Sequence, residues 1–216
     1  MKIFNKLAPL PEGTLREQIE ALAASVGFRV SAISVMDASR RSTRLNAFFS
    51  GLGRTREVVL YDTLIEKMGE DEITAVLAHE LGHAIHKDIP RMLLQQVILF
   101  GAYLALFGLV AGSDSLAQAF GLSGAHFGFS LLLFSILISP LDFLLDIPMN
   151  HFSRKAEYAA DAFAAGKTSR EAMGNALVCL AQENLSNLNP HPLFVLLHYN
   201  HPTLAQRLRA IRGEGG

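Results

Sequence analysis

The chain has 216 residues, enough for one domain with a sizeable core or for one domain that also carries membrane segments. Its formal net charge of −1 lacks the basic excess of nucleic-acid-binding proteins, so no nucleic-acid partner is expected. Its one cysteine, Cys179, excludes an intrachain disulfide, and the mean hydropathy of +0.27 is high for a soluble enzyme.

The N-terminal part of the chain predicts a helix followed by strands. A capping-box pattern from Thr14 to Glu17 indicates the start of a helix with one apolar face. Alternating residues at 28–36 predict a strand. Two short apolar runs, 45–49 and 58–61, are separated by a glycine-containing linker and are typical of a β-hairpin.

A second helix, over residues 72–87, carries the motif H-E-x-x-H. Residues four apart lie on one face of a helix, so His79 and His83 can offer two imidazole nitrogens to one metal ion. Zinc suits neutral imidazole and carboxylate ligands in tetrahedral geometry. Glu80 then lies where a carboxylate can take a proton from water, the arrangement found in zinc peptidases.

The alternative to a metal site is a surface helix that carries two histidines by chance. Apolar residues around the motif favour a half-buried helix, whose imidazoles then need partners. A third histidine at the metzincin spacing is absent, because position 89 is Ile89. The third ligand therefore comes from elsewhere, most simply from a glutamate on a later helix as in the gluzincins. His86 is expected to be exposed rather than a ligand, and Pro90 is expected to close the helix.

The predicted hairpin has two interpretations. An exposed strand edge beside the metal helix can pair with the backbone of an extended peptide and present one bond to the metal. The other interpretation is an ordinary structural hairpin, and spacing alone does not decide between them.

Two apolar segments predict a transmembrane hairpin. Residues 92–111 contain no charged side chain and are long enough to span a bilayer. Residues 127–148 form the second segment, although it contains Asp142 and Asp146. Basic residues flank only the outer ends of the pair, which puts both ends and the metal site on the cytoplasmic side. The alternative is a pair of buried core helices in a soluble protein.

The segment after the second apolar run offers the missing ligand. Glu157 and Asp161 share a helix face, so Glu157 can complete the metal site while Asp161 accepts the second N–H of a ligand histidine. Taken alone, two carboxylates at this spacing usually form a solvated helix face. Near the C-terminus, His201 precedes Pro202, a favoured first helical residue, and can either cap the last helix or donate to a developing oxyanion.

Several motifs together resemble those of the zinc-dependent CAAX prenyl proteases. The matching segments follow the family's order along nearly the whole chain and comprise residues 35–42, 46–51, 59–64, 79–83, 157–161 and 201–203 with Arg207. The resemblance covers the catalytic half of such proteins, which carry further membrane helices upstream.

The resemblance implies an integral-membrane gluzincin with one Zn²⁺ per chain. It implies His79, His83 and Glu157 as zinc ligands and Glu80 as general base. It also implies that His201 stabilises the oxyanion, that Arg207 supports His201 and that Asp161 orients a ligand. The strand with Asn46, Ala47 and Phe48 is implied to hold the substrate backbone.

The fold class expected is α+β, mainly α, with a zincin-like catalytic domain and a small β-hairpin or sheet. The two-helix transmembrane hairpin is inserted between the H-E-x-x-H helix and the helix of the third ligand, within one peptidase domain over residues 1–216.

The expected function is that of a membrane zinc metalloendopeptidase acting on peptides or proteins, including CAAX-type or prenylated peptides, with membrane lipid as a further partner. A quality-control zinc protease of the heat-shock type and a zinc-binding membrane scaffold without catalysis are the alternatives.

Overall fold

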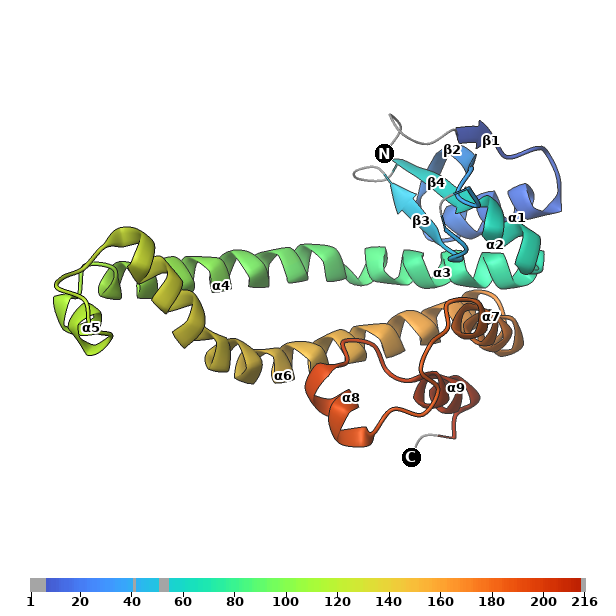
Figure 1. The fold of residues 1–216 in the computed structure, drawn as a ribbon. Coiled ribbons are helices and arrows are strands. Elements are labelled where there is room, and N and C mark those ends of the chain that lie inside the picture. The colour runs from blue at the N-terminus through green and yellow to red at the C-terminus, as the bar shows by residue number, and fades with distance from the viewer. Residues whose placement is uncertain (1–6, 41, 51–54, 215–216) are drawn as a thin grey trace.

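The computed structural model describes residues 7–40, 42–50 and 55–214 and consists of a body from which a long helical hairpin projects (Figure 1). The body holds the sheet and the helices packed near it. The hairpin runs out along α4, turns at α5 and returns along α6 into the body (Figure 1). The described residues are mainly helical with one small sheet, so the expected fold class is confirmed.

The sheet is mixed and has the strand order β1-β2-β4-β3. The strands are β1 (Leu7–Pro9), β2 (Arg29–Met36), β3 (Ala47–Ser50) and β4 (Thr55–Tyr61). β1 pairs antiparallel with β2, and β3 pairs antiparallel with β4. The two central strands, β2 and β4, run parallel to each other. The predicted strand and the antiparallel pairing of the predicted hairpin are confirmed, and the linker at 51–54 lies outside the described residues.

Helix α1 (Thr14–Ala24) begins differently from the prediction. Gly13 is its N-cap residue and no side chain caps it, so Thr14 is the first helical residue and the predicted capping box is wrong. The backbone oxygen of Gly13 accepts the first helical hydrogen bond from Glu17, at 3.1 Å. The apolar face is buried as expected, through Leu15, Ile19 and Leu22.

After the short α2 (Asp62–Lys67), helix α3 (Glu70–His86) carries the H-E-x-x-H motif and is mostly buried. Acidic residues in its first turn and His86 in its last complement the helix dipole. The helix ends at Lys87, which adopts a left-handed conformation with φ 57° and ψ 38°. The prediction that Pro90 closes α3 is therefore wrong. Pro90 lies in the first turn of α4, where backbone N–H groups make no hydrogen bond within the helix, so the N–H that proline lacks is not needed there.

The hairpin consists of α4 (Asp88–Val110), α5 (Asp114–Ala119) and the first part of α6 (Phe127–Lys167). Both long helices contain apolar windows long enough to cross a membrane, and none of the α4 window is buried. Large apolar side chains along α4 are open to the surroundings; Leu93 and Phe100, for example, are each 64% exposed. The alternative of buried core helices is therefore contradicted.

Helix α6 is one helix of 41 residues, and it continues through Pro140 and Pro148. It leaves the hairpin and enters the body without a break, so no change of secondary structure marks the end of the apolar segment expected at residue 148. Tyr103 of α4 donates a hydrogen bond to Asp142 of α6, which ties the two sides of the hairpin together.

In the body, α3 packs against α6, and α7 and α9 pack beside them. The remaining helices are α7 (Arg170–Glu183), α8 (Pro192–His198) and α9 (Leu204–Arg212). The contact between α3 and α6 is close at Gly82, where a Cβ atom would lie 3.1 Å from the Cα of Ala160. This approach brings the motif face of α3 onto residues of α6 far along the chain.

Candidate metal centre

The two motif histidines converge on one point from α3. The Nε2 atoms of His79 and His83 lie 3.1 Å apart, and their rings meet at 90°. His79 is buried and His83 is half-buried, because Leu77, Ala78 and Leu81 of the same helix belong to the core. The one-turn spacing therefore places both nitrogens on the inner face of α3, as the sequence predicted.

Glu157 of α6 meets these nitrogens. Its Oε2 lies 3.6 Å from Nε2 of His79, and its Oε1 lies 3.4 Å from Nε2 of His83. The possible ligand atoms of the three residues all lie within 4.8 Å of one another. The side chain of Glu157 is buried, so the solvated helix face considered for Glu157 and Asp161 is contradicted.

The spacing of these atoms fits zinc. Ligand atoms 2.0–2.2 Å from a tetrahedral zinc lie about 3.3–3.6 Å from one another, close to the separations of the three residues. Two imidazoles and one carboxylate are also the ligand set of a catalytic zinc that keeps a position open. In addition, Oε2 of Glu157 is buried and accepts no hydrogen bond within the described structure, as expected of a ligand oxygen.

Carboxylates hold the other nitrogen of each histidine. Oδ1 of Asp161 lies 2.9 Å from Nδ1 of His79, and Oδ2 of Asp88 lies 2.8 Å from Nδ1 of His83. A carboxylate accepts a hydrogen bond only from a protonated nitrogen, so each contact favours the tautomer in which Nε2 is free to bind a metal. Asp161 thus lies where the sequence predicted an orienting group.

Arg207 of α9 lies behind these acidic groups. It donates two hydrogen bonds to Asp161, from Nε at 2.7 Å and from Nη2 at 2.5 Å, and Nη2 lies 3.5 Å from Oε2 of Glu157. Burial opposes ionisation of Asp161, but the hydrogen bonds from Arg207 and His79 outweigh it and lower the pKa of Asp161. Arg207 therefore contacts Asp161 and approaches Glu157 and His79, and its contacts among the described residues do not include His201, which the resemblance implied it supports.

The ionisable side chains of the candidate site perturb one another's pKa values. Burial of Glu157 opposes its ionisation and would raise its pKa. Hydrogen bonds from His201 and His83, together with the charge of Arg207, have the larger combined effect, so the pKa of Glu157 is lowered. The hydrogen bond to Glu157 is the main cause that raises the pKa of His83 to about 9, and Asp88 adds to it against the effect of burial. A metal ion must therefore displace a proton from His83 at neutral pH.

Glu80 lies next to His79 on α3 and is only partly accessible. Burial raises the pKa of Glu80, against the opposing charges of His79 and His83. A raised pKa moves a carboxylate towards neutral pH, where it can both accept and return a proton. This environment suits the predicted general base.

His201 reaches the same site from the loop before α9. Its Nδ1 lies 3.1 Å from Oε1 of Glu157, and its side chain is 58% exposed. The capping residue of α9 is Thr203, whose side chain forms a capping box with Gln206. The last helix therefore does not begin at Pro202, the alternative in which His201 caps that helix is wrong, and His201 instead lies beside Glu157.

The strand expected to hold substrate is the edge strand β3, which contacts α3. Ala47 is buried and Phe48 is half-buried, whereas Asn46 precedes the strand and is exposed. The backbone oxygen of Asn46 accepts a hydrogen bond from Tyr61, at 3.1 Å, which fixes this end of the strand on β4. The structure thus places the predicted strand beside the motif helix, and its role towards substrate stays a prediction.

Sequence reasoning missed Asp88 and misplaced His86. Asp88 carries a weak signal, namely an acidic residue five positions after the second motif histidine. His86 is half-buried rather than exposed, and its ring packs edge-on against Phe163 with centroids 6.1 Å apart. As expected, His86 is outside the ligand cluster found among the described residues.

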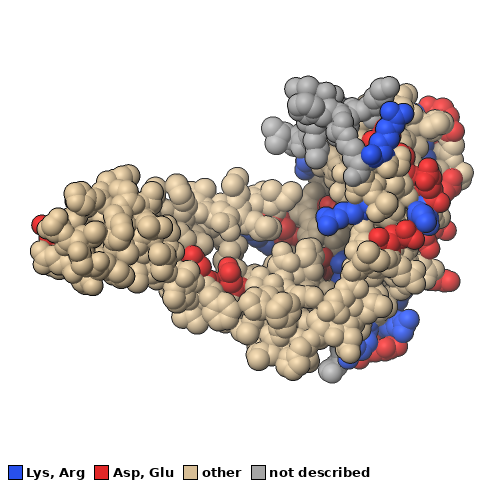
Figure 2. Space-filling view, viewed as in Figure 1, with Lys and Arg blue, Asp and Glu red and all other residues tan. Residues whose placement is uncertain are grey.

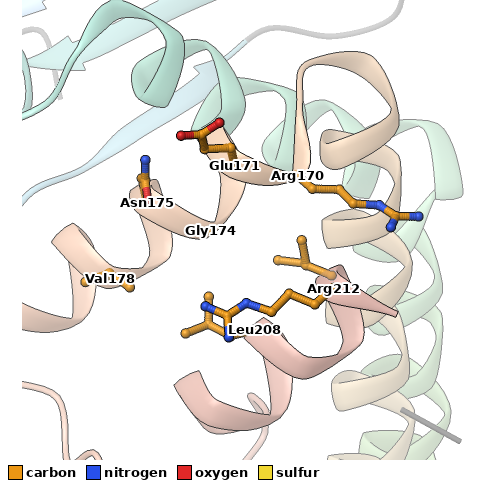
Figure 3. Close-up of a pocket in the computed structure, with 8 residues that line it drawn as sticks. Arg170, Glu171, Gly174, Asn175, Val178, Leu208 and Arg212 are labelled. Atoms are coloured by element: carbon orange, nitrogen blue, oxygen red, sulfur yellow. The ribbon is translucent and has the colours of Figure 1, made fainter. Parts of the chain in front are cut away.

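A separate pocket of about 260 Å³ lies between α7 and α9 (Figure 3). Gly174 and Val178 of α7 and Leu208 and Arg212 of α9 are among the residues that line it. None of the predicted site residues lines this pocket.

Comparisons of the sequence and of the fold with known proteins point to the same family. The model of peptidase family M48 matches residues 9–215. The chain is 42% identical over 217 residues to CAAX prenyl protease 1 homolog of Arabidopsis thaliana and 37% identical over 227 residues to CAAX prenyl protease 1 of Saccharomyces cerevisiae. These alignments each cover 98% of this chain and 50% of the relative.

A solved structure shows the same fold. The crystal structure of S. mikatae Ste24p superimposes with a TM-score of 0.87 at 36% identity, over 97% of this chain and 52% of that one. This chain thus spans about half the length of these relatives. The resemblance inferred from the motifs is confirmed, and the chain belongs to peptidase family M48.

Proposed function

We propose that this chain is a zinc metalloendopeptidase that acts at a membrane. The observation that carries the proposal is the convergence of His79, His83 and Glu157, with Glu80 beside them, in a member of a peptidase family. The three residues come from two helices separated by the whole hairpin, so the fold must assemble the ligand set.

The side chains divide the work of hydrolysis. Bound zinc supplies Lewis acidity, which polarises a peptide carbonyl and lowers the pKa of water. Glu80 accepts a proton from the attacking water and returns it to the leaving amine nitrogen. His201, exposed and 3.1 Å from Glu157, donates a hydrogen bond to the oxygen that gains negative charge.

The substrate is a peptide or protein that binds in an extended conformation along β3. An edge strand offers unpaired backbone groups, and β3 lies against α3, so a peptide paired with it passes the metal ligands. The relatives named CAAX prenyl proteases support C-terminal CAAX-type or prenylated peptides as the substrate class.

The hairpin of α4 and α6 crosses the bilayer, with the body on the cytoplasmic side. The support is the exposed apolar surface of both helices and the basic residues at the body end of the hairpin, which include Lys87, Arg91 and Lys155. A cysteine introduced at Ser123 in a Cys179→Ser background tests this orientation. Labelling of that cysteine by an impermeant reagent only from the cytoplasmic side would contradict it.

The activity is tested with the variant Glu80→Gln in lipid or detergent. This change removes the proton acceptor but leaves the ligands, so zinc content stays at the wild-type level while cleavage falls by at least about 10²-fold. Cleavage is followed with a farnesylated CAAX peptide and its unmodified counterpart. Turnover retained in Glu80→Gln would refute the assignment of the base.

The peptide pair also separates the proposed specificity from its alternatives. Preference for the farnesylated peptide supports a CAAX protease, whereas equal cleavage of both peptides indicates a quality-control protease of the heat-shock type. Wild-type protein that binds zinc and cleaves no peptide would instead indicate a zinc-binding membrane scaffold.

A further inference from the structure

Asp88 is a buried carboxylate at the first position of α4, only 8% exposed. Lys87, in its left-handed conformation, is both the C-cap residue of α3 and the N-cap residue of α4. This one-residue junction turns the chain so that Asp88 faces back onto the last turns of α3. There its Oδ2 lies 2.8 Å from Nδ1 of His83.

We infer that Asp88 is a positioning residue for the metal ligand His83. By accepting a hydrogen bond from Nδ1–H, it fixes the tautomer and the ring orientation in which Nε2 faces His79 and Glu157. The inference rests on the proposed zinc site and assigns a role to a residue outside the motifs recognised in the sequence.

The inference fits the two other contacts around the histidines. His79 is held in the same way by Asp161, so each ligand imidazole has its own carboxylate. Asp161 comes from α6, whereas Asp88 comes from the start of α4. The position of His83 therefore depends on how the first apolar helix leaves the body.

Two simpler roles for Asp88 make different demands on the structure. An acidic residue at a helix start stabilises the helix dipole while exposed, and so requires neither burial nor contact with a histidine. An ion pair with Arg91 is the second possibility, but Nη1 of Arg91 lies 3.8 Å away and its side chain is 71% exposed. The shorter and more buried contact is the one with His83.

The test measures zinc affinity of the full chain in detergent, by competition with a chromophoric chelator, for wild type, Asp88→Ala, Asp88→Asn and Arg91→Ala. Loss of an orienting partner typically weakens metal binding about 10- to 100-fold, and this is expected for Asp88→Ala. Asp88→Asn keeps an acceptor oxygen without the charge and loses less. Arg91→Ala, which removes only the exposed ion pair, binds zinc as wild type does.

Two further measurements separate positioning from general destabilisation. Thermal unfolding of the zinc-free proteins should give similar midpoints for wild type and Asp88→Asn, with the difference appearing only when zinc is added. The d–d absorption of the cobalt-substituted protein should shift in Asp88→Ala, because the geometry of the His83 ligand changes. If Asp88→Ala does not fold, Asp88→Asn alone decides the inference.

The outcomes distinguish this inference from the proposed function. Zinc affinity within twofold of wild type in both Asp88 variants would overturn the positioning role and leave the zinc site intact. A loss of affinity in Arg91→Ala equal to that in Asp88→Ala would assign the effect to the start of α4 and also overturn it. Wild-type protein that binds no zinc would overturn the proposed function and this inference together.

Discussion

Arg207 is the cation around which the acidic side of the site is arranged. It lies 2.5 Å from Asp161 and 3.5 Å from Glu157, and it is only 14% exposed. Without this cation, two buried carboxylates would face each other with only imidazoles as partners. The charge of Arg207 thus keeps both Glu157 and Asp161 ionised. Ionised Glu157 can bind a metal, and ionised Asp161 can accept a hydrogen bond.

We therefore expect Arg207→Met to destabilise the protein by about 3–5 kcal/mol, because it leaves a buried carboxylate uncompensated. The measurement is unfolding in detergent by heat or denaturant, without added zinc. The double variant Arg207→Met with Asp161→Asn should lose less than the single variant, since it also removes the unpaired charge. A double variant less stable than Arg207→Met would contradict this account.

At this scale the sequence predicted the residues whose spacing is helical. His79, Glu80 and His83 follow from the period of one helix, and Glu157 follows from the need for a third ligand together with the family motifs. Asp88 could not be predicted, because its approach to His83 depends on the left-handed backbone of Lys87, a non-glycine residue with no local signal for that conformation.

The packing of α3 on α6 determines whether the three proposed ligands, His79, His83 and Glu157, lie close together. Gly82 lies between the two ligand histidines in sequence, and a Cβ there would lie 3.1 Å from the Cα and 3.3 Å from the Cβ of Ala160. Displacing a backbone atom of a packed helix costs more free energy than rotating a flexible side chain. Glycine at this position therefore sets the distance between the two helices that supply the ligands.

Gly82→Ala should consequently destabilise the protein by about 1–3 kcal/mol through overpacking, although alanine favours an isolated helix. It should also weaken zinc binding, because separation of the helices moves Glu157 away from the histidines. The measurements are thermal unfolding of the zinc-free protein and chelator competition.

Gly174→Ala in α7 is the matched control. A Cβ at Gly174 would meet only the end of the Leu208 side chain, at 3.7 Å, which is an ordinary contact. Helix propensity then predicts a stabilisation of up to about 1 kcal/mol and unchanged zinc affinity. Equal effects of the two substitutions would argue against a special role for the contact at Gly82.

Element types were predictable from periodicity, but their ends were not. The helix carrying the motif, its end near residue 87 and the antiparallel strands were predicted, whereas the start of α1 and the cause of the end of α3 were not. Gly13 caps α1 with backbone alone, and Lys87 ends α3 three residues before Pro90. Such ends depend on backbone conformations that side-chain patterns do not reveal.

At the scale of the whole molecule, charge and apolar surface are separated. Figure 2 shows Lys, Arg, Asp and Glu gathered on the body, while the projecting hairpin is almost free of them on this face. Hydropathy alone predicted two apolar helices but left open whether they were buried. Only the structure shows that their apolar faces, from Ile89 to Phe143, are not covered by the rest of the described chain.

The same separation explains how distant parts of the sequence form one candidate metal site. The hairpin leads away from α3 after His83 and returns along α6 to Glu157, so the ligand set closes only when the hairpin has folded. The family motifs indicated which residues meet. A helix carrying Glu157 and Asp161 was also predicted, and the structure shows that this helix is the end of α6, which continues through Pro148 and brings Glu157 back to α3.

The most direct test of this account is the zinc content and zinc affinity of purified wild-type protein and of the variant Glu157→Gln. We predict one zinc ion per chain in the wild type, and a loss of affinity of at least about 10-fold in Glu157→Gln, since the ion loses its only carboxylate ligand. The helical content of the variant should match that of the wild type. A folded Glu157→Gln protein that holds zinc as tightly as the wild type would contradict the claim that α3 and α6 bind one metal ion together.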